Sequence, residues 1–224
     1  MKKLPLVSVL IVTHNRKELL RKCLESVRNQ TYKNIETIVV DDGSTDDFTD
    51  LLGLATIFVQ IPKSGIAIAR NVAMEEASGE YYFILDSDDT IEPTCIEKSI
   101  EYIIENKADW LISELNIIDE ENNIIGFFPS KIQTFEECFQ SKYIPHPSTL
   151  LCARFVGDTR YDTEFISAVD LDFTLALLLK NPKIVLLPER LTNYRKHGNQ
   201  ETGTEKQNKN AMKIREKYIP WINK

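Results

Sequence analysis

Short apolar runs alternate with amphipathic stretches over the first ninety residues of the chain. Residues 7–12 are largely β-branched and almost continuously apolar, which is typical of a strand covered on both faces. Asn15 is placed to cap a helix, with Glu18 three positions later, and apolar residues recur at helical spacing from Leu19 to Val27. Further strands are predicted at 35–40, 57–61 and 81–85, and a second helix at 66–77, ended by Gly79 in a left-handed conformation. This alternation predicts an α/β fold with a mostly parallel sheet wound by right-handed crossovers.

The pattern becomes less regular after Pro93. A helix is predicted from there to about Asn106, and two apolar runs flank the polar segment 119–123 as in a hairpin. The remaining predicted elements are hairpin strands 110–118 and 124–128, a strand at 150–152, a helix at 168–179 and a polar tail at 204–224, expected as a surface helix or partly frayed. The second half is therefore expected to be mixed.

Composition fits one soluble globular domain over residues 1–224, with 42 % hydrophobic and 27 % charged residues. We divide it into a first half (1–90), a second half (91–200) and a C-terminal tail (201–224). A chain of this length buries roughly 70 % of its unfolded surface, so the core needs neither disulfides nor a structural metal. The net charge of −7 and the absence of a Lys/Arg run argue against nucleic-acid binding.

The cysteines and the N-terminus bear on the cellular compartment. The four cysteines are scattered, without a Cys-x-x-Cys pair, and are expected to be reduced, mostly buried thiols. Met1-Lys2-Lys3 followed by apolar residues resembles a secretory signal, but Pro5 interrupts the apolar stretch and no small-residue cleavage site follows. No apolar run is long enough for a transmembrane segment. We expect a cytoplasmic protein, with peripheral membrane association and homo-oligomerisation left open.

Polar residues follow the predicted parallel strands at the points where each strand ends. The first strand ends in Thr13-His14-Asn15, the second in Asp41-Asp42-Gly43-Ser44-Thr45-Asp46, and the fourth in Asp86-Ser87-Asp88-Asp89. In open α/β sheets, ligands bind outside the carboxyl ends of the strands. Because closely spaced carboxylates repel one another, a divalent cation such as Mg²⁺ or Mn²⁺, held with phosphate oxygens, is expected beside Asp86 and Asp88.

These segments, together with Gly65-Ile66-Ala67-Ile68-Ala69-Arg70-Asn71, resemble the ordered motifs of the family 2 glycosyltransferases, which have the GT-A fold. The resemblance implies inverting transfer of a sugar from a nucleotide-diphosphate donor, expected to be a UDP-sugar, to a hydroxyl of a glycan or lipid-linked acceptor, as in bacterial surface glycan synthesis. It places Thr13 and Asn15 near the nucleotide, Asp42 on the uracil edge and Arg70 against the base or its phosphates. Asp86 then lies against the ribose and Asp88 binds the metal.

The resemblance makes residues 1–90 the nucleotide-sugar-binding half and residues 91–200 the acceptor and catalytic-base half, although it extends only weakly into this second half. Family members open a helix there with a Glu-Asp pair that supplies the catalytic base; here Val169 replaces the Glu, Asp170 aligns with the base, and Asp172 is a rival. Residues 188–197 resemble the closing motif of the family, in which His197 approaches the metal or the diphosphate. Acceptor choice is expected to lie in the segment 133–149, which carries no family motif.

Other interpretations fit parts of the pattern. The Asp, Ser and Gly residues at the strand ends also suit turns and helix caps, Asp170 and Asp172 suit a helix N-terminus, and Arg70 suits a surface position. His197 alone suits a solvated loop, and His14 and His146 are taken as structural. The stretch 82–90 also matches the Asp-x-Asp-x-Thr motif of haloacid dehalogenase-like phosphatases, with Asp86 as nucleophile, although that motif normally follows the first strand. A non-catalytic sugar-nucleotide-binding subunit is a third hypothesis, supported by Val169.

Overall fold

The structure is a computed structural model that describes residues 4–140, 144–198 and 205–222. Met1-Lys2-Lys3, residues 141–143 of the predicted acceptor segment, and residues 199–204 and 223–224 at the two ends of the tail lie outside the described residues.

The first half forms the predicted parallel sheet. Its strands are β1 (Val7–Thr13), β2 (Ile35–Asp42), β3 (Ile57–Ile61) and β4 (Tyr81–Asp86), which lie parallel in the order β3-β2-β1-β4. The four strand predictions are confirmed, and β2 and β4 continue to the aspartates that follow their apolar runs. The carboxyl ends of these strands therefore meet at one edge of the sheet.

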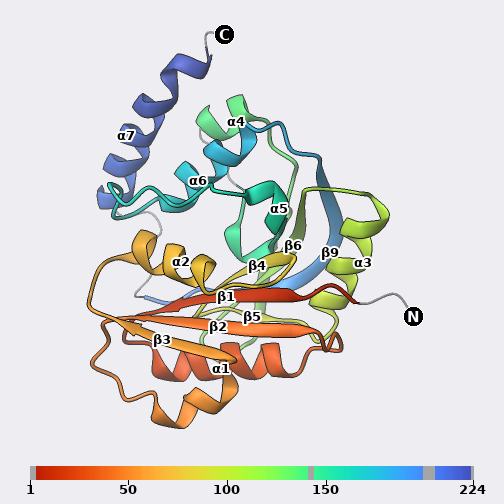
Figure 1. Cartoon of the computed structure of the whole chain (residues 1–224), viewed down its shortest axis with the longest axis vertical. Helices are drawn as coiled ribbons and strands as arrows, with labels where there is room; N and C mark the ends of the chain where they lie inside the picture. The colour runs from red at the N-terminus through yellow and green to blue at the C-terminus, as the bar shows by residue number, and fades with distance from the viewer. Residues whose placement is uncertain (1–3, 141–143, 199–204, 223–224) are drawn as a thin grey trace.

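Helices cover both faces of this sheet (Figure 1). Alternate side chains of a strand point to opposite faces, so Val9 and Ile11 of β1 pack with Leu24 of helix α1 (Lys17–Arg28), whereas Leu10 packs with Ala69 of helix α2 (Ile66–Glu75). A 3₁₀ segment, η1 (Thr49–Leu54), lies beside α1. The continuously apolar strands thus supply two hydrophobic cores, one on each face.

Two predicted helix ends are wrong. Asn15 does not cap α1: it has a φ of 51°, the helix begins at Lys17, and the Lys17 N–H donates to Asp46 Oδ2 at 3.0 Å. A carboxylate from another loop therefore satisfies this helix terminus.

Helix α2 ends at Glu75, and Gly79 is not left-handed. Gly79 is required because a Cβ there would lie 2.4 Å from Ser8 Oγ, which accepts a hydrogen bond from the Gly79 N–H.

The second half extends the same sheet with strands of both directions. β8 (Thr149–Cys152) lies antiparallel to β4 and to β6 (Trp110–Ile118), which forms the predicted hairpin with β7 (Ile124–Phe128). β9 (Ile184–Arg195) lies parallel to β6, and the short β5 (Thr90–Ile91) lies antiparallel to β9. The apolar pattern did not predict β9 as one strand, because Pro188 and Glu189 interrupt it; register shifts opposite Glu114 accommodate them.

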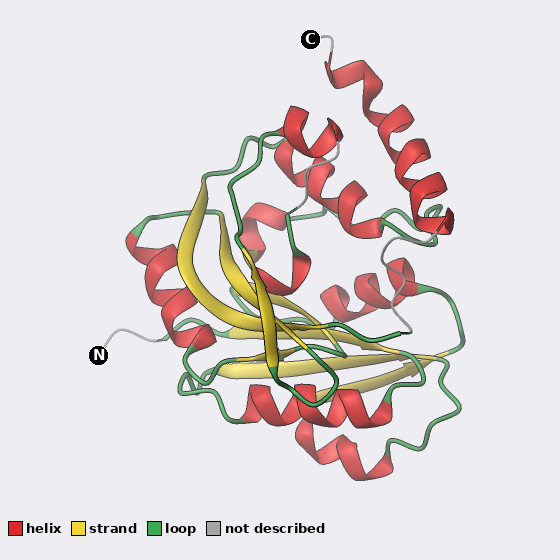
Figure 2. Ribbon diagram, turned by 180° about the vertical axis from the view of Figure 1, so that it is seen from behind, coloured by secondary structure: helices red, strands yellow, loops and turns green. Residues whose placement is uncertain are grey.

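The remaining helices pack beside this extension and on one another (Figure 2). They are α3 (Cys95–Glu105), α4 (Phe135–Gln140), the 3₁₀ turn η2 (His146–Ser148), α5 (Ala153–Val156), α6 (Val169–Leu178) and α7 (Glu205–Ile222). The predictions of α3 and α6 are confirmed, and the tail is a helix that buries Ile214 and Tyr218 in the core containing α6. Among the described helices, none combines the length and apolar character that crossing a bilayer requires. All four cysteines are free, as expected, and Cys152 alone is half-buried.

Candidate active site

Three aspartates meet where β4 ends. Asp86, Asp88 and Asp89 each offer a carboxylate oxygen, and these oxygens lie within 4.8 Å of one another. The Asp89 N–H donates to the Asp86 carbonyl at 3.0 Å, which closes the chain into a tight turn. In an extended strand Asp89 would point to the face opposite Asp86 and Asp88, so the turn is what brings all three carboxylates together. The set consists of hard oxygen donors, the type that Mg²⁺ and Mn²⁺ prefer.

Cationic groups and backbone donors surround this acidic cluster. Asp88 Oδ2 accepts a hydrogen bond from Arg16 Nη1 at 2.6 Å and lies 2.9 Å from His197 Nε2. Asp89 Oδ1 accepts the Arg195 N–H at 2.8 Å, whereas Asp89 Oδ2 is buried without a hydrogen-bond partner in the described part of the chain. Burial and the neighbouring carboxylates raise the pKa values of Asp86 and Asp89 above the usual range for aspartate. The cluster thus contains a buried carboxylate oxygen that no donor of the described chain satisfies.

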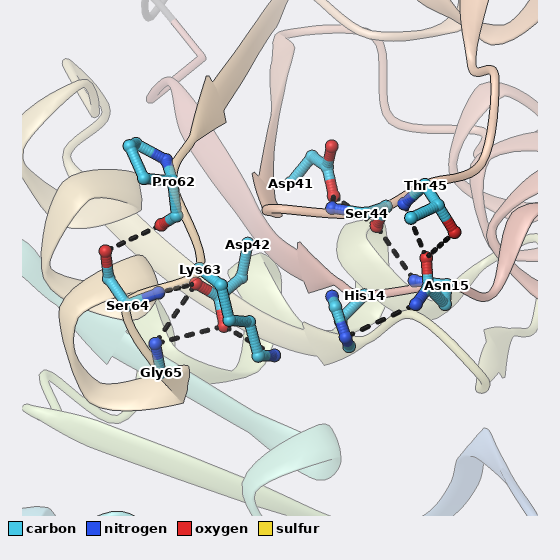
Figure 3. Close-up of polar contacts among 10 residues, drawn as sticks. All are labelled: His14, Asn15, Asp41, Asp42, Ser44, Thr45, Pro62, Lys63, Ser64 and Gly65. Carbon is cyan, nitrogen blue, oxygen red and sulfur yellow. Dashed lines mark hydrogen bonds and ion pairs between the residues drawn. The ribbon is translucent and has the colours of Figure 1, made fainter.

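Asp42, at the end of β2, organises the loop before α2 (Figure 3). Its Oδ1 accepts the backbone N–H of Ser64 at 2.6 Å, and the Gly65 N–H lies 3.1 Å from both carboxylate oxygens. Lys63 Nζ lies 2.9 Å from Oδ2. Burial disfavours the charged carboxylate, but the Ser64, Lys63 and Gly65 donors outweigh it and lower the pKa of Asp42. The Asp42 carboxylate, which is predicted to contact uracil, therefore holds the loop before α2 in place.

The predicted nucleotide residues at the end of β1 form a second loop contact (Figure 3). Asn15 Oδ1 accepts the Thr45 N–H at 2.8 Å, and the Asn15 N–H donates to Ser44 Oγ at 2.8 Å. Asp41 holds the same turn by accepting the Ser44 N–H at 3.1 Å. Thr13 is 2 % exposed, and its Oγ1 has no hydrogen-bond partner among the described residues. These contacts align the ends of β1 and β2 beside each other.

Arg70 is buried, so its interpretation as a surface residue is wrong. Its Nη2 donates to Asp86 Oδ1 at 2.9 Å, and its guanidinium carbon lies 5.3 Å from the centre of the Tyr161 ring. Burial disfavours its charge, but Tyr161, Asp86 and Asp170 outweigh that effect and raise the pKa of Arg70. Arg70 therefore carries a fixed positive charge at the acidic edge of the sheet.

The two candidate bases lie in different surroundings on α6. The Asp170 charge acts on Arg70, Asp86 and Tyr161, and its carboxylate makes no hydrogen bond within the described residues. Asp172 is 2 % exposed and pairs with Lys217 Nζ of α7 at 2.7 Å. The structure thus brings Asp170 to the acidic edge, while Asp172 is engaged by the C-terminal helix.

Several residues of the site had no assigned role from the sequence. Arg16 directly follows Thr13-His14-Asn15, and Arg195 lies within the closing motif 188–197, so both could have been assigned with their motifs. Arg195 is fully buried, and its Nε donates to the Asp88 carbonyl at 2.9 Å. His197 is bound to Asp88 rather than solvated. Tyr161 carries no sequence signal, because it lies in a loop outside every motif.

Comparison with known proteins decides the family. The family model "Glycosyl transferase family 2" matches residues 8–153, a range that includes the ends of β1, β2 and β4. The chain belongs to glycosyl transferase family 2. An uncharacterised glycosyltransferase of Methanocaldococcus jannaschii is 31 % identical over 205 residues, covering 85 % of this chain and 71 % of that protein. The glycosyltransferase GlyG of Streptococcus pneumoniae serotype 4 is 35 % identical over 130 residues, covering 55 % of this chain and 43 % of that protein.

Solved structures show the same GT-A-like fold. The crystal structure of S. aureus TarS in complex with UDP superimposes with a TM-score of 0.75 at 20 % identity, covering 94 % of this chain and 64 % of that one. The TarS complex with UDP-GlcNAc gives a TM-score of 0.73 at 21 % identity, covering 87 % of this chain and 60 % of that one. The chain thus spans less than two thirds of the TarS chains and less than half of GlyG.

Family membership makes the chain a glycosyltransferase and sets aside the phosphatase hypothesis. The structure supplies the physical reason, because the Asp-x-Asp motif follows the fourth strand of a glycosyltransferase sheet, and Asp86 is paired with Arg70. A match of sequence letters outside its structural context does not carry the chemistry of the motif.

Proposed function

We propose that this glycosyltransferase moves a sugar from a UDP-sugar to a hydroxyl of a glycan or lipid-linked acceptor, with inversion at the anomeric carbon and a divalent cation bound. The observation that carries the proposal is the meeting of Asp86, Asp88, Asp89, Arg70 and Asp170 at one edge of a family 2 sheet. The UDP and UDP-GlcNAc bound by the TarS structural neighbours favour a uridine donor.

The acidic cluster fits a hard divalent cation. It offers three carboxylates, and one buried oxygen, Asp89 Oδ2, has no hydrogen-bond partner in the described chain. In this proposal Asp88 is the main ligand, and His197 lies close enough to take part. Mn²⁺ or Mg²⁺, when bound there, supplies positive charge that stabilises a diphosphate leaving group. Thr13, Asn15 and Asp42 line the nucleotide side, and Asp86 faces the ribose.

Asp170 is the proposed general base. It takes the proton of the acceptor hydroxyl as the acceptor oxygen forms its bond to the sugar C1. The bond between C1 and the diphosphate oxygen breaks in the same displacement, and its electron pair leaves with the diphosphate. Arg70 stabilises negative charge near the nucleotide and its phosphates. Asp170 carries no competing hydrogen bond in the described structure, unlike Asp172, which is paired with Lys217.

The first prediction tests the donor and the metal. UDP at about 100 times its Kd in the presence of Mn²⁺ should stabilise the folded protein by about 2.7 kcal/mol, because only the folded state binds it. Asp88→Asn should remove the Mn²⁺-dependent part of the shift in melting temperature, whereas exposed Asp158→Asn should retain it. An undiminished Mn²⁺ effect in Asp88→Asn would place the metal elsewhere.

The second prediction tests the base. Asp170→Asn should lower the transfer rate by about 10²- to 10⁴-fold while leaving UDP-sugar affinity nearly unchanged, because a general base acts in the transition state. Asp172→Asn should slow transfer much less, although loss of its pair with Lys217 should lower the melting temperature. Titration calorimetry and transfer assays on the same preparations check this. Good UDP-sugar binding with no transfer by wild type would support the non-catalytic hypothesis that Val169 raised.

A further inference from the structure

The side chain of Asn71 holds the backbone of Tyr161 from across the molecule. Asn71 Oδ1 accepts the Tyr161 N–H at 2.8 Å, and Asn71 Nδ2 donates to the Tyr161 carbonyl at 2.9 Å. Asn71 follows Arg70 on α2, whereas Tyr161 lies in the segment between α5 and α6. The Asn71 side-chain amide therefore fixes this segment of the second half to α2, which carries Arg70. It does so by bonding both the backbone N–H and the backbone carbonyl of Tyr161.

The Tyr161 ring lies in a stack that leads from the donor side of the site to α6. The guanidinium carbon of Arg70 lies 5.3 Å from the centre of this ring. On its other contact the ring stacks on Phe173, with ring centres 4.2 Å apart and planes 13° from parallel. Phe173 is buried and stands three positions after Asp170, which is about one helical turn. Asp86, Arg70, Tyr161 and Phe173 thus form a continuous series of contacts.

We propose that Asn71 and Tyr161 are positioning residues that hold the first turn of α6, and with it Asp170, in register with Arg70 and Asp86. The proposal rests on the proposed function, in which Asp170 is the base. The Asp170 charge acts on Arg70 and Asp86, in keeping with the place of α6 beside this stack. Reacting groups tolerate little displacement, because a shift of about 1 Å in a catalytic group can cost about 10²-fold in rate.

Other contacts hold the same segment without reaching the donor side. Lys180 Nζ donates to Thr159 Oγ1 at 2.9 Å, and Lys217 Nζ pairs with Asp162 Oδ2 at 2.9 Å. Lys180 belongs to the second half and Lys217 to the C-terminal tail. The Asn71 contact is different, because it joins α2 of the first half to the residue that packs on α6.

A double-mutant cycle with Asn71→Ala and Asp170→Asn tests the proposal through Mn²⁺-dependent release of UDP from UDP-GlcNAc, UDP-glucose and UDP-galactose, which needs no known acceptor. Asn71→Ala should lower the rate of UDP release by about 10-fold when it is introduced into the wild-type protein. It should lower that rate by less than about twofold when it is introduced into Asp170→Asn, because the effects of residues that act through one group are not additive. UDP affinity should stay within about threefold of wild type. Lys180→Met, which loosens the same segment from the other side, should leave the rate unchanged.

Two further variants separate positioning from packing. Tyr161→Leu should lower the rate as Asn71→Ala does, and Tyr161→Phe should recover most of the loss, because it keeps the ring that contacts Arg70 and Phe173. An equal loss from Asn71→Ala in both backgrounds, or a lowered melting temperature with an unchanged rate, would overturn the proposal. No binding of UDP or of any of the three donors by wild type in the presence of Mn²⁺, or an Asp170→Asn rate equal to wild type, would instead refute the proposed function.

Discussion

At the scale of single residues, burial sets the charge of side chains beneath the site. His146 is 2 % exposed, and neither ring nitrogen has a hydrogen-bond partner in the described chain. Its ring lies 6.0 Å from those of Tyr161 and Phe173. Burial, and then the nearby Arg70 charge, lower its pKa well below 6.5. His146 is therefore neutral in the folded protein and supports the aromatic stack, in line with its interpretation as structural.

The lowered pKa predicts a pH-dependent stability. Below pH 6.5 the unfolded chain takes up a proton on His146 that the folded protein does not, so stability should fall by up to about 1.4 kcal/mol per pH unit between pH 6.5 and 5. Above pH 6.5 the contribution is constant. His146→Phe keeps an aromatic ring and should remove this part of the slope. Denaturant unfolding at pH 7.5, 6 and 5 measures it, and an identical slope in both proteins would contradict the assignment.

At the scale of elements, the loops after β2 and β3 each depend on a glycine, Gly43 for its backbone conformation and close packing and Gly65 for its backbone conformation alone. Gly43 has a φ of +69°, and a Cβ there would lie 2.5 Å from the Lys63 backbone nitrogen. Gly65 has a φ of +97°, and its N–H donates to Asp42. Left-handed backbone favours glycine in both places. The two loops thereby present Asp42 and the start of α2 together.

Gly43→Ala should therefore damage this pair of loops. We expect a loss of about 1–3 kcal/mol in the free energy of unfolding, because both the backbone strain and the Lys63 contact oppose the methyl group. UDP affinity should fall as Asp42 is displaced. Gly53→Ala in η1 is the matched control, since a Cβ there meets nothing within 4 Å and the stability should change by less than about 0.5 kcal/mol. Equal effects of the two substitutions in urea unfolding would refute the argument.

At the scale of the whole molecule, one sheet crosses the boundary between the two halves. β8 pairs with β4 of the first half and with β6 of the second, and β5 pairs with β9. The two hydrophobic cores likewise contain residues from both halves, such as Val9 with Leu111 and Leu10 with Trp110. Neither half therefore has a core of its own.

This shared core predicts a single cooperative unfolding transition. Trp110 is buried in β6, and Trp221→Phe would leave it as the one tryptophan of the chain. Its fluorescence in urea should change at the same midpoint as the far-ultraviolet circular dichroism. UDP with Mn²⁺, which is proposed to bind at the ends of the first-half strands, should raise both midpoints equally. Separate midpoints would show that the halves unfold independently.

The sequence by itself determined the parallel half of the fold and the chemistry of its edge. Continuous β-branched runs mark buried parallel strands, and aspartates directly after such runs must lie at the carboxyl edge of the sheet. The strands 7–12, 35–40, 57–61 and 81–85 and the cluster beginning at Asp86 follow from this local information. The family motifs are local for the same reason.

Only the tertiary structure decided which groups meet across the chain. Asp46 caps α1 in place of Asn15, His197 and Arg16 reach Asp88, and β9 passes through Pro188 because a register shift accommodates it. It also distinguished Asp170 from Asp172, two acids on the same turn of α6, by pairing the second with Lys217. Tyr161 entered the site through Asn71, ninety positions away. Such contacts depend on how far-separated elements pack, which no local periodicity encodes.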